Sequence, residues 1–183
     1  MRFGSVRLPR PRTRLNQKKG VFLFLKNLLF TVIVPGTVAV YGPFRLAASR
    51  EGLPAGWGVL QVVALLPLAC GGVIYFWCLW DFATFGRGTP APIDAPKRLV
   101  VRGLYRYVRN PMYVGVLLVI AGWAVLFQSP RILGYGLIVA LFFHLFVVAV
   151  EEPSLRGKFG DSYVRYCREV RRWVPRSSRG RAA

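Results

Sequence analysis

The sequence predicts an all-α fold, a polytopic membrane helical bundle with about four transmembrane helices and a C-terminal amphipathic cytoplasmic helix. Three observations support this. Hydrophobic residues make up 54% of the 183 residues and gather in long uninterrupted runs. Lys and Arg are concentrated in the segments between alternate runs. Near the C-terminus, large apolar residues recur at helical spacing among arginines.

Four apolar runs have about the 17 to 25 residues that a helix needs to cross a bilayer, or come close to it. They are Val21 to Tyr41, Trp57 to Trp80, Met112 to Phe127 and Ile132 to Val150. Tryptophans bracket the second run, as interfacial anchoring favours. The last two runs are separated only by residues 128–131, which predicts a tight antiparallel hairpin.

The positive charge indicates orientation. Of the 26 Lys and Arg residues, 22 fall in residues 1–20, 81–110 and 151–183, which four spans would place on one side of the membrane. Because basic segments stay on the cytoplasmic side, we expect both termini in the cytoplasm. The net charge of +19 therefore predicts no nucleic-acid partner. The Arg- and Ala-rich composition suggests a bacterial inner membrane.

These patterns divide the chain into four parts. Residues 1–20 form a basic disordered arm beside anionic lipid, and residues 21–80 form an N-terminal transmembrane helix pair. Residues 81–175 form a catalytic region, and residues 176–183 form a flexible tail. No small-residue cleavage site follows the first run, so we expect it to be retained. Three unpaired cysteines and a single histidine predict neither a disulfide nor a metal site.

The stretch from Arg102 to Gly115 joins a basic, aromatic loop to an apolar helix. Pro111 favours the first turn of a helix, and Asn110 is then its N-cap. A helix N-terminus beside Arg109 and its neighbouring arginines should attract a carboxylate or phosphate. The same arginines would also serve as topology signals and head-group contacts, and this alternative stays open.

The fourth run ends in Glu151 and Glu152, two carboxylates expected at a helix C-terminus, where they oppose the helix dipole. Something positive must compensate them. Arginine 102, 109 or 172 would do so, and so would a cationic group on a ligand; both can hold at once. His144 shares this helix face and is interpreted as an interhelical hydrogen-bonding residue.

The C-terminal region predicts an amphipathic helix at the cytoplasmic interface. Its apolar face combines Phe159, Tyr163, Tyr166, Val170 and Trp173, at a spacing of 4, 3, 4 and 3. Gly160 breaks the preceding turn, and Asp161 or Ser162 caps the new helix.

Together these motifs resemble the isoprenylcysteine carboxyl methyltransferase and phospholipid methyltransferase family, over about residues 98–175. The likeness combines Gly103-Leu104-Tyr105-Arg106-Tyr107-Val108-Arg109-Asn110-Pro111-Met112-Tyr113-Val114-Gly115 with the downstream Glu151-Glu152-Pro153-Ser154-Leu155, Phe159-Gly160, Tyr163, Tyr166 and Arg172-Trp173-Val174-Pro175. The resemblance implies an integral membrane methyltransferase that uses S-adenosylmethionine and acts on a lipophilic substrate from the bilayer.

The resemblance also implies roles for particular residues. Cofactor binding is expected at Gly103, Tyr105, Arg109, Asn110, Pro111, Tyr113, Gly115, Glu151 and Glu152. Arg172 is expected to face the substrate, and with Glu152 it forms the expected catalytic pair. The charges of these residues complement those of the cofactor. S-adenosylmethionine carries a carboxylate, an ammonium and a sulfonium, and the chain offers a cationic helix N-terminus and a pair of carboxylates. The methyl acceptor and the oligomeric state stay open.

Two other function classes remain at this point. A membrane sterol reductase with NADPH has a similar basic, Pro-Tyr-Gly segment, but four spans are short for such an enzyme. The acidic pair also suits an ammonium better than a phosphate. A non-catalytic lipid-binding membrane protein is the second alternative.

Overall fold

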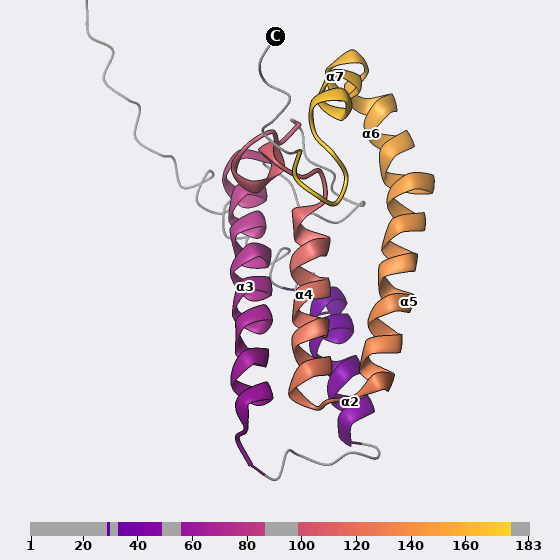
Figure 1. Ribbon diagram of the computed structural model, residues 1–183. Coiled ribbons are helices and arrows are strands. Elements are labelled where there is room, and N and C mark those ends of the chain that lie inside the picture. The colour runs from indigo at the N-terminus through magenta and orange to yellow at the C-terminus, as the bar shows by residue number, and fades with distance from the viewer. Residues whose placement is uncertain (1–28, 30–32, 49–55, 87–98, 177–183) are drawn as a thin grey trace, which may run out of the picture.

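The computed structural model describes residues 29, 33–48, 56–86 and 99–176, and this part of the chain is helical without a named strand. Three long helices lie side by side: α3 (Val59–Asp81), α4 (Pro111–Leu126) and α5 (Pro130–Phe146). They run in alternating directions, so the end of α3, the start of α4 and the end of α5 meet at one end of the bundle (Figure 1).

The hairpin between α4 and α5 confirms the short connection expected from the sequence. Ser129 precedes α5, and its Oγ accepts a hydrogen bond from the backbone N–H of Ile132 at 3.3 Å. Pro130 begins the helix, where its missing N–H costs nothing. Ile120 and Ile132 are almost completely buried near this turn. The hairpin end is therefore closed by apolar packing.

Helices α3 and α4 pack closely through a glycine seam formed by Gly71, Gly115 and Gly122. A Cβ added to Gly115 would lie 2.8 Å from the carbonyl oxygen of Gly71, and one added to Gly71 would lie 2.5 Å from that of Gly115. At Gly122 an added Cβ would lie 2.6 Å from Leu68 Cγ. Small residues allow two backbones to approach this closely, as at helix contacts within membranes.

The first predicted span lies mostly outside the described residues. Its end is helical, with a π-helical segment η1 (Thr37–Tyr41) continuing into α2 (Gly42–Ala48). The helix therefore continues beyond Tyr41, where the apolar run of the sequence ends. Gly42 lies against the ring of Tyr135, whose hydroxyl donates to the carbonyl of Val38 at 2.9 Å, so packing on α5 supports this extension.

The helix that begins with α5 does not end at the two glutamates. It passes through a π-helical turn, η5 (Val147–Glu151), into α6 (Glu152–Phe159). The expected helix C-terminus at Glu151 and Glu152 is thus wrong. Pro153 conflicts with the carbonyl four residues earlier in a regular α-helix, and the wider turn directly before it relieves that conflict.

The π turn also changes the direction of Glu152. In a regular helix, Glu152 would point about 140° away from the buried Val147, because successive residues are about 100° apart. One extra residue in the turn reduces that angle to about 40°. Glu152 is consequently 4% exposed and faces the start of α4.

The C-terminal region forms a shorter helix than expected. α7 (Asp161–Glu169) begins after Gly160, whose φ of 51° favours glycine, and Tyr163, Tyr166 and Val170 are buried together. The chain leaves the helix at Val170, so Trp173 does not continue this face as expected. Residues 170–176 instead lie alongside the start of α4 (Figure 1).

Among the described residues, two helices are long and apolar enough to cross a membrane. They cover Val59–Thr84, with 26 residues, and Pro130–Phe159, with 30. The first includes the start of a π-helical segment, η2 (Phe82–Gly86). α4 is equally apolar but has 16 residues. Their outer faces expose many large hydrophobic side chains, as a lipid environment requires.

Candidate functional site

A cavity lies at the end of the bundle where α3, α4 and the α5–α6 helix meet. Its volume is about 160 Å³, roughly ten times what one water molecule needs, so it accommodates part of a larger molecule. Apolar residues line much of it: Phe82, Leu99, Val100, Met112, Val147, Val150, Leu155 and Phe159. The polar lining residues are Tyr105, Arg109, Asn110, Tyr113, Glu151, Glu152, Ser154, Tyr163 and Tyr166.

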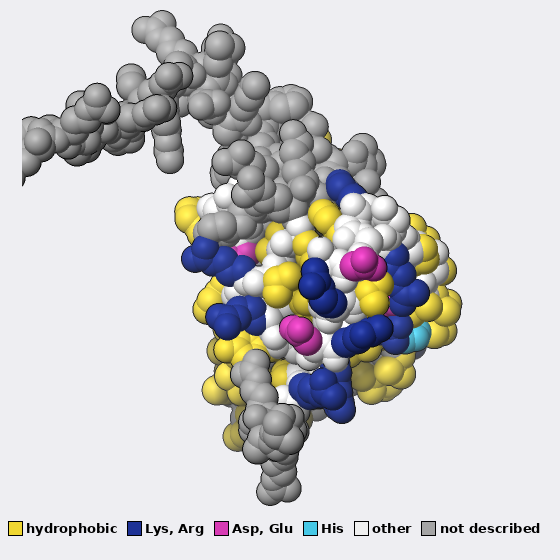
Figure 2. Space-filling model, turned by 90° about the horizontal axis from the view of Figure 1, so that it is seen from above, with side chains coloured by type: hydrophobic (Ala, Val, Ile, Leu, Met, Phe, Trp, Pro, Cys, Tyr) yellow, Lys and Arg dark blue, Asp and Glu magenta, His cyan; other side chains and the backbone are white. Residues whose placement is uncertain are grey.

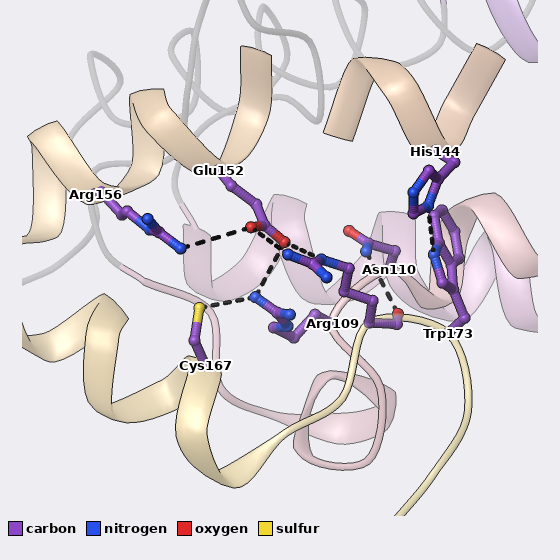
Figure 3. Close-up of polar contacts among 8 residues, drawn as sticks. Arg109, Asn110, His144, Glu152, Arg156, Cys167 and Trp173 are labelled. Atoms are coloured by element: carbon purple, nitrogen blue, oxygen red, sulfur yellow. Dashed lines mark hydrogen bonds and ion pairs between the residues drawn. The ribbon is translucent and has the colours of Figure 1, made fainter. Parts of the chain in front are cut away.

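An arginine cluster, formed by Glu152 with Arg109, Arg172 and Arg156, closes one side of the cavity (Figure 3). Arg172 binds the carboxylate through two hydrogen bonds, Nε to Oε1 at 2.6 Å and Nη2 to Oε2 at 3.0 Å. Arg109 Nη1 lies 3.1 Å from Oε1, and Arg156 Nη2 lies 3.8 Å from Oε2. Glu152 is thus fully compensated by protein cations.

This pairing also affects Arg172, whose side chain is 38% exposed. The hydrogen bond with Glu152 raises the pKa of the Arg172 guanidinium above its ordinary value. The backbone fixes the same segment, because the N–H groups of Arg109 and Asn110 donate to the carbonyls of Arg171 and Arg172 at 2.8 and 3.2 Å. Residues 170–176 are therefore held to the start of α4 by backbone and side-chain contacts.

Arg109 has an unused donor inside this cluster. Its side chain is 10% exposed, and its Nη1 is shared between Glu152 Oε1 and Cys167 Sγ, the latter at 2.8 Å. Its Nε is buried without a hydrogen-bond partner among the described residues. A buried unpaired donor is costly, and the described residues provide no acceptor for this N–H.

Glu151 differs from its neighbour, although both line the cavity. The hydroxyl of Tyr113 donates to Glu151 Oε1 at 2.6 Å. The described part of the chain provides no ion pair for Glu151, whereas Glu152 contacts three arginines. Glu151 therefore contributes an uncompensated carboxylate to the cavity, suited to a cationic group.

Comparison with known proteins places the chain in a family. A family model described as phospholipid methyltransferase matches residues 59–162, more than half of the chain. The chain belongs to the phospholipid methyltransferase family. This family consists of membrane methyltransferases, and the match covers α3, the start of α4 and the glutamate pair. The family match ends at residue 162, so residues 170–176, which include Arg172, lie outside the match.

One similar protein comes from Haemophilus influenzae. It is 42% identical over 64 residues, which is 34% of this chain and the full length of that protein. It is described as an uncharacterized protein, so the likeness adds no substrate.

The structure brings most of the predicted site residues together. Tyr105, Arg109, Asn110, Tyr113, Glu151 and Glu152 all line the cavity. Arg109 and Glu152, 43 residues apart in sequence, are in contact as the predicted site requires. Asn110 precedes α4 at the N-cap position, but it makes no side-chain capping bond. Its Nδ2 instead donates to the carbonyl of Arg172 at 3.3 Å.

The remaining predicted residues lie around the cavity without lining it. Gly103, with a φ of 54°, packs against Asp81 and Trp77 of α3, where an added Cβ would collide with the Asp81 carboxylate. Pro111 is fully buried at the start of α4. Gly115 belongs to the glycine seam. The side chain of Arg172 contacts the cavity wall through Glu152.

Sequence reasoning did not assign Tyr163 and Tyr166 to the site, although both line the cavity. The Tyr166 hydroxyl donates to the carbonyl of Tyr105 at 2.7 Å. Burial raises the pKa of Tyr105 and of Tyr166 well above the ordinary tyrosine value, so both stay protonated donors. Their spacing predicts the apolar face of an amphipathic helix at the cytoplasmic interface, and no separate signal in the sequence distinguishes a cavity wall from such a face.

Proposed function

We propose that this protein uses S-adenosylmethionine to methylate a lipophilic or membrane-associated acceptor. The observation that supports this is the pair of uncompensated groups on one cavity, the buried Nε of Arg109 and the carboxylate of Glu151. A zwitterionic amino-acid group carries the two matching charges. The donor set therefore fits the cofactor that the family implies.

The two glutamates take different roles in this proposal. Arg109 would bind the cofactor carboxylate through the N–H that has no partner, and Glu151 would bind the ammonium. Glu152 would not touch the cofactor, because Arg109 and Arg172 already occupy both of its oxygens. The predicted catalytic pair of Glu152 and Arg172 thus becomes a structural pair that fixes Arg109.

The cofactor supplies a methyl group on a positively charged sulfur. The protein aligns the reacting groups and keeps water out, which suits an in-line displacement. The buried phenols of Tyr105 and Tyr166 stay protonated, so neither serves as a base at neutral pH. Glu151 has no ion pair with any residue that the structure describes, and its proposed contact with the ammonium occupies its carboxylate. An acceptor that arrives as an anion needs no base.

The cavity wall supports entry of the acceptor from the bilayer. Val150 lines the cavity and is also 47% exposed, on a helix whose neighbouring Leu145 and Val148 are exposed too. Ser154, one turn further along, is likewise exposed and lines the cavity. The cavity thus opens beside an apolar face, where a lipid chain would lie.

The charge distribution supports the proposed orientation. Seen from above, the end of the bundle that holds the cavity carries numerous Lys and Arg side chains (Figure 2). Under the positive-inside rule this end is cytoplasmic, in a bacterial inner membrane with four spans, and α7 lies at its interface. This arrangement would let a cytosolic cofactor and a lipid-borne acceptor meet in one cavity.

Ligand binding tests the proposal. The full chain, purified in detergent, should be stabilised against heat by S-adenosylhomocysteine in a saturable manner, and NADPH should have no effect. Glu151→Gln should abolish the shift, whereas Glu169→Gln, at an exposed position on α7, should keep it. Stabilisation by NADPH alone would favour a reductase, and a response to neither compound would favour a non-catalytic lipid-binding protein.

A further inference from the structure

Cys167 contacts the charged cluster although neither its position in the sequence nor the family match points to it. It lies on α7, half-buried, and packs with Tyr163, Tyr166 and Val170. Its sulfur accepts a hydrogen bond from Arg109 Nη1 at 2.8 Å (Figure 3). Tyr163, which lines the cavity, also forms a side-chain hydrogen bond with it.

Arg109 is held by two different helices through a single nitrogen atom. One nitrogen, Nη1, donates a hydrogen bond to Cys167 Sγ of α7 and forms an ion pair with Glu152 Oε1 of α6. A planar guanidinium held at one corner by two acceptors from different helices has little freedom to rotate. With Glu152 alone, it would be free to turn about a single contact. Cys167 therefore decides where the unpartnered Nε lies.

We propose that Cys167 is a positioning residue that orients Arg109 for the carboxylate of the bound cofactor. This inference rests on the proposed function. Through the same contact, α7 is connected to the cofactor site, because Cys167 and the cavity-lining Tyr163 and Tyr166 belong to one helix. A group added to the sulfur would displace the guanidinium and weaken cofactor binding.

The experiment measures S-adenosylhomocysteine affinity by isothermal titration of the purified full chain. Cys167→Val removes the acceptor and should weaken binding about tenfold, the typical effect of losing a hydrogen bond to a charged group. Cys167→Ser keeps an acceptor and should restore most of the affinity. Cys70→Val makes the same change at an exposed cysteine of α3 and should have no effect.

A second measurement is independent of whether Cys167→Val folds. In a Cys70→Ser chain, methyl methanethiosulfonate transfers its CH₃S group to the cysteine sulfur, which forms an S–S bond as methanesulfinate leaves. Intact mass and peptide mapping establish modification of Cys167, which should weaken S-adenosylhomocysteine binding at least tenfold. The Cys70→Ser, Cys167→Ser chain should bind equally well before and after treatment.

The outcomes separate the two proposals. Wild-type binding with unchanged affinity in Cys167→Val, or in chain modified at Cys167, would overturn the role of Cys167 and leave the proposed function standing. Equal weakening in Cys167→Val and Cys167→Ser would also overturn it, because packing rather than an acceptor would then matter. Absence of binding in the wild-type chain would overturn the proposed function, and this inference with it.

Discussion

The glycine seam and the arginine cluster connect helices in different ways. The seam uses direct backbone contact, and the cluster uses charged side chains. At the seam, Gly71 and Gly115 bring two apolar helices together until a single Cβ would reach the opposite backbone. At the cluster, Glu152 and its arginines join α6 to the start of α4 and to residues 170–176, beside the cavity. This difference indicates that stability and ligand binding depend on separate residues. Single substitutions should therefore change the free energy of unfolding and the ligand affinity independently.

The largest effect is expected for Glu152→Gln. It leaves Arg109 and Arg172 without their shared anion, and Arg109 is buried. Breaking a buried ion pair on one side typically costs about 3–5 kcal/mol. We expect a loss of that size in the free energy of unfolding, measured by thermal or denaturant unfolding in detergent. Glu169→Gln on the exposed face of α7 should change it by less than about 0.5 kcal/mol.

A stability for Glu152→Gln within about 1 kcal/mol of the wild type would contradict the assignment of the cluster as a structural device.

Glu151→Gln should separate binding from stability. The adjacent carboxylate has no ion pair in the described part of the chain, so its removal should leave the unfolding temperature nearly unchanged. Its proposed contact with a cationic group is worth about 1.5–3 kcal/mol, or roughly ten- to a hundredfold in affinity for S-adenosylhomocysteine. Titration calorimetry checks this. A large loss of stability with normal affinity would reverse the roles of the two glutamates.

Substitutions at two adjacent glycines test the contribution of the glycine seam to stability. Gly71→Ala places a Cβ 2.5 Å from the carbonyl oxygen of Gly115, so the helices must separate, at a cost of about 1–3 kcal/mol. Gly72→Ala meets nothing within 4 Å and should be neutral or stabilising by up to about 1 kcal/mol. Unfolding in detergent measures both. Equal effects of the two substitutions would show that this close approach does not contribute to stability.

The smallest effect concerns the contact between the C-terminal segment and α5. The Trp173 indole N–H donates to His144 Nδ1 at 3.2 Å on the surface, and the ring also contacts Tyr113. Trp173→Phe keeps a ring but loses the hydrogen bond, worth about 0.5–1.5 kcal/mol. We expect a decrease of that order in stability, with His144→Phe giving a similar one. If the two losses add fully in the double variant, the bond does not exist in solution.

The sequence allowed prediction of features that depend on local chemistry. Pro111 marks the start of α4, and Ser129 and Pro130 mark the start of α5. Arg109, Glu152 and Arg172 were identified as candidates, whereas Arg156 of the same cluster was not. The contact between Arg109 and Glu152 was predictable because the short turn after α4 makes α5 run back antiparallel, which brings the end of that helix to the start of α4.

Other features depend on three-dimensional context that sequence spacing does not contain. The π turn of residues 147–151 changes the direction in which Glu152 points, and this turn was not predicted from the sequence. The two glutamates look alike in sequence, yet the structure pairs Glu152 with arginines and gives Glu151 no ion pair among the residues it describes. Gly103 and Gly115 matched the family motif, whereas their positions show close packing against α3.

Equilibrium binding of radiolabelled S-adenosylmethionine to the purified full chain tests the central claim most directly. We predict one saturable site per chain, displaced by S-adenosylhomocysteine, with strongly reduced binding in Arg109→Lys and in Glu151→Gln and normal binding in Gly72→Ala. Wild-type affinity in both Arg109→Lys and Glu151→Gln would contradict the claim that these two residues hold the cofactor in this cavity.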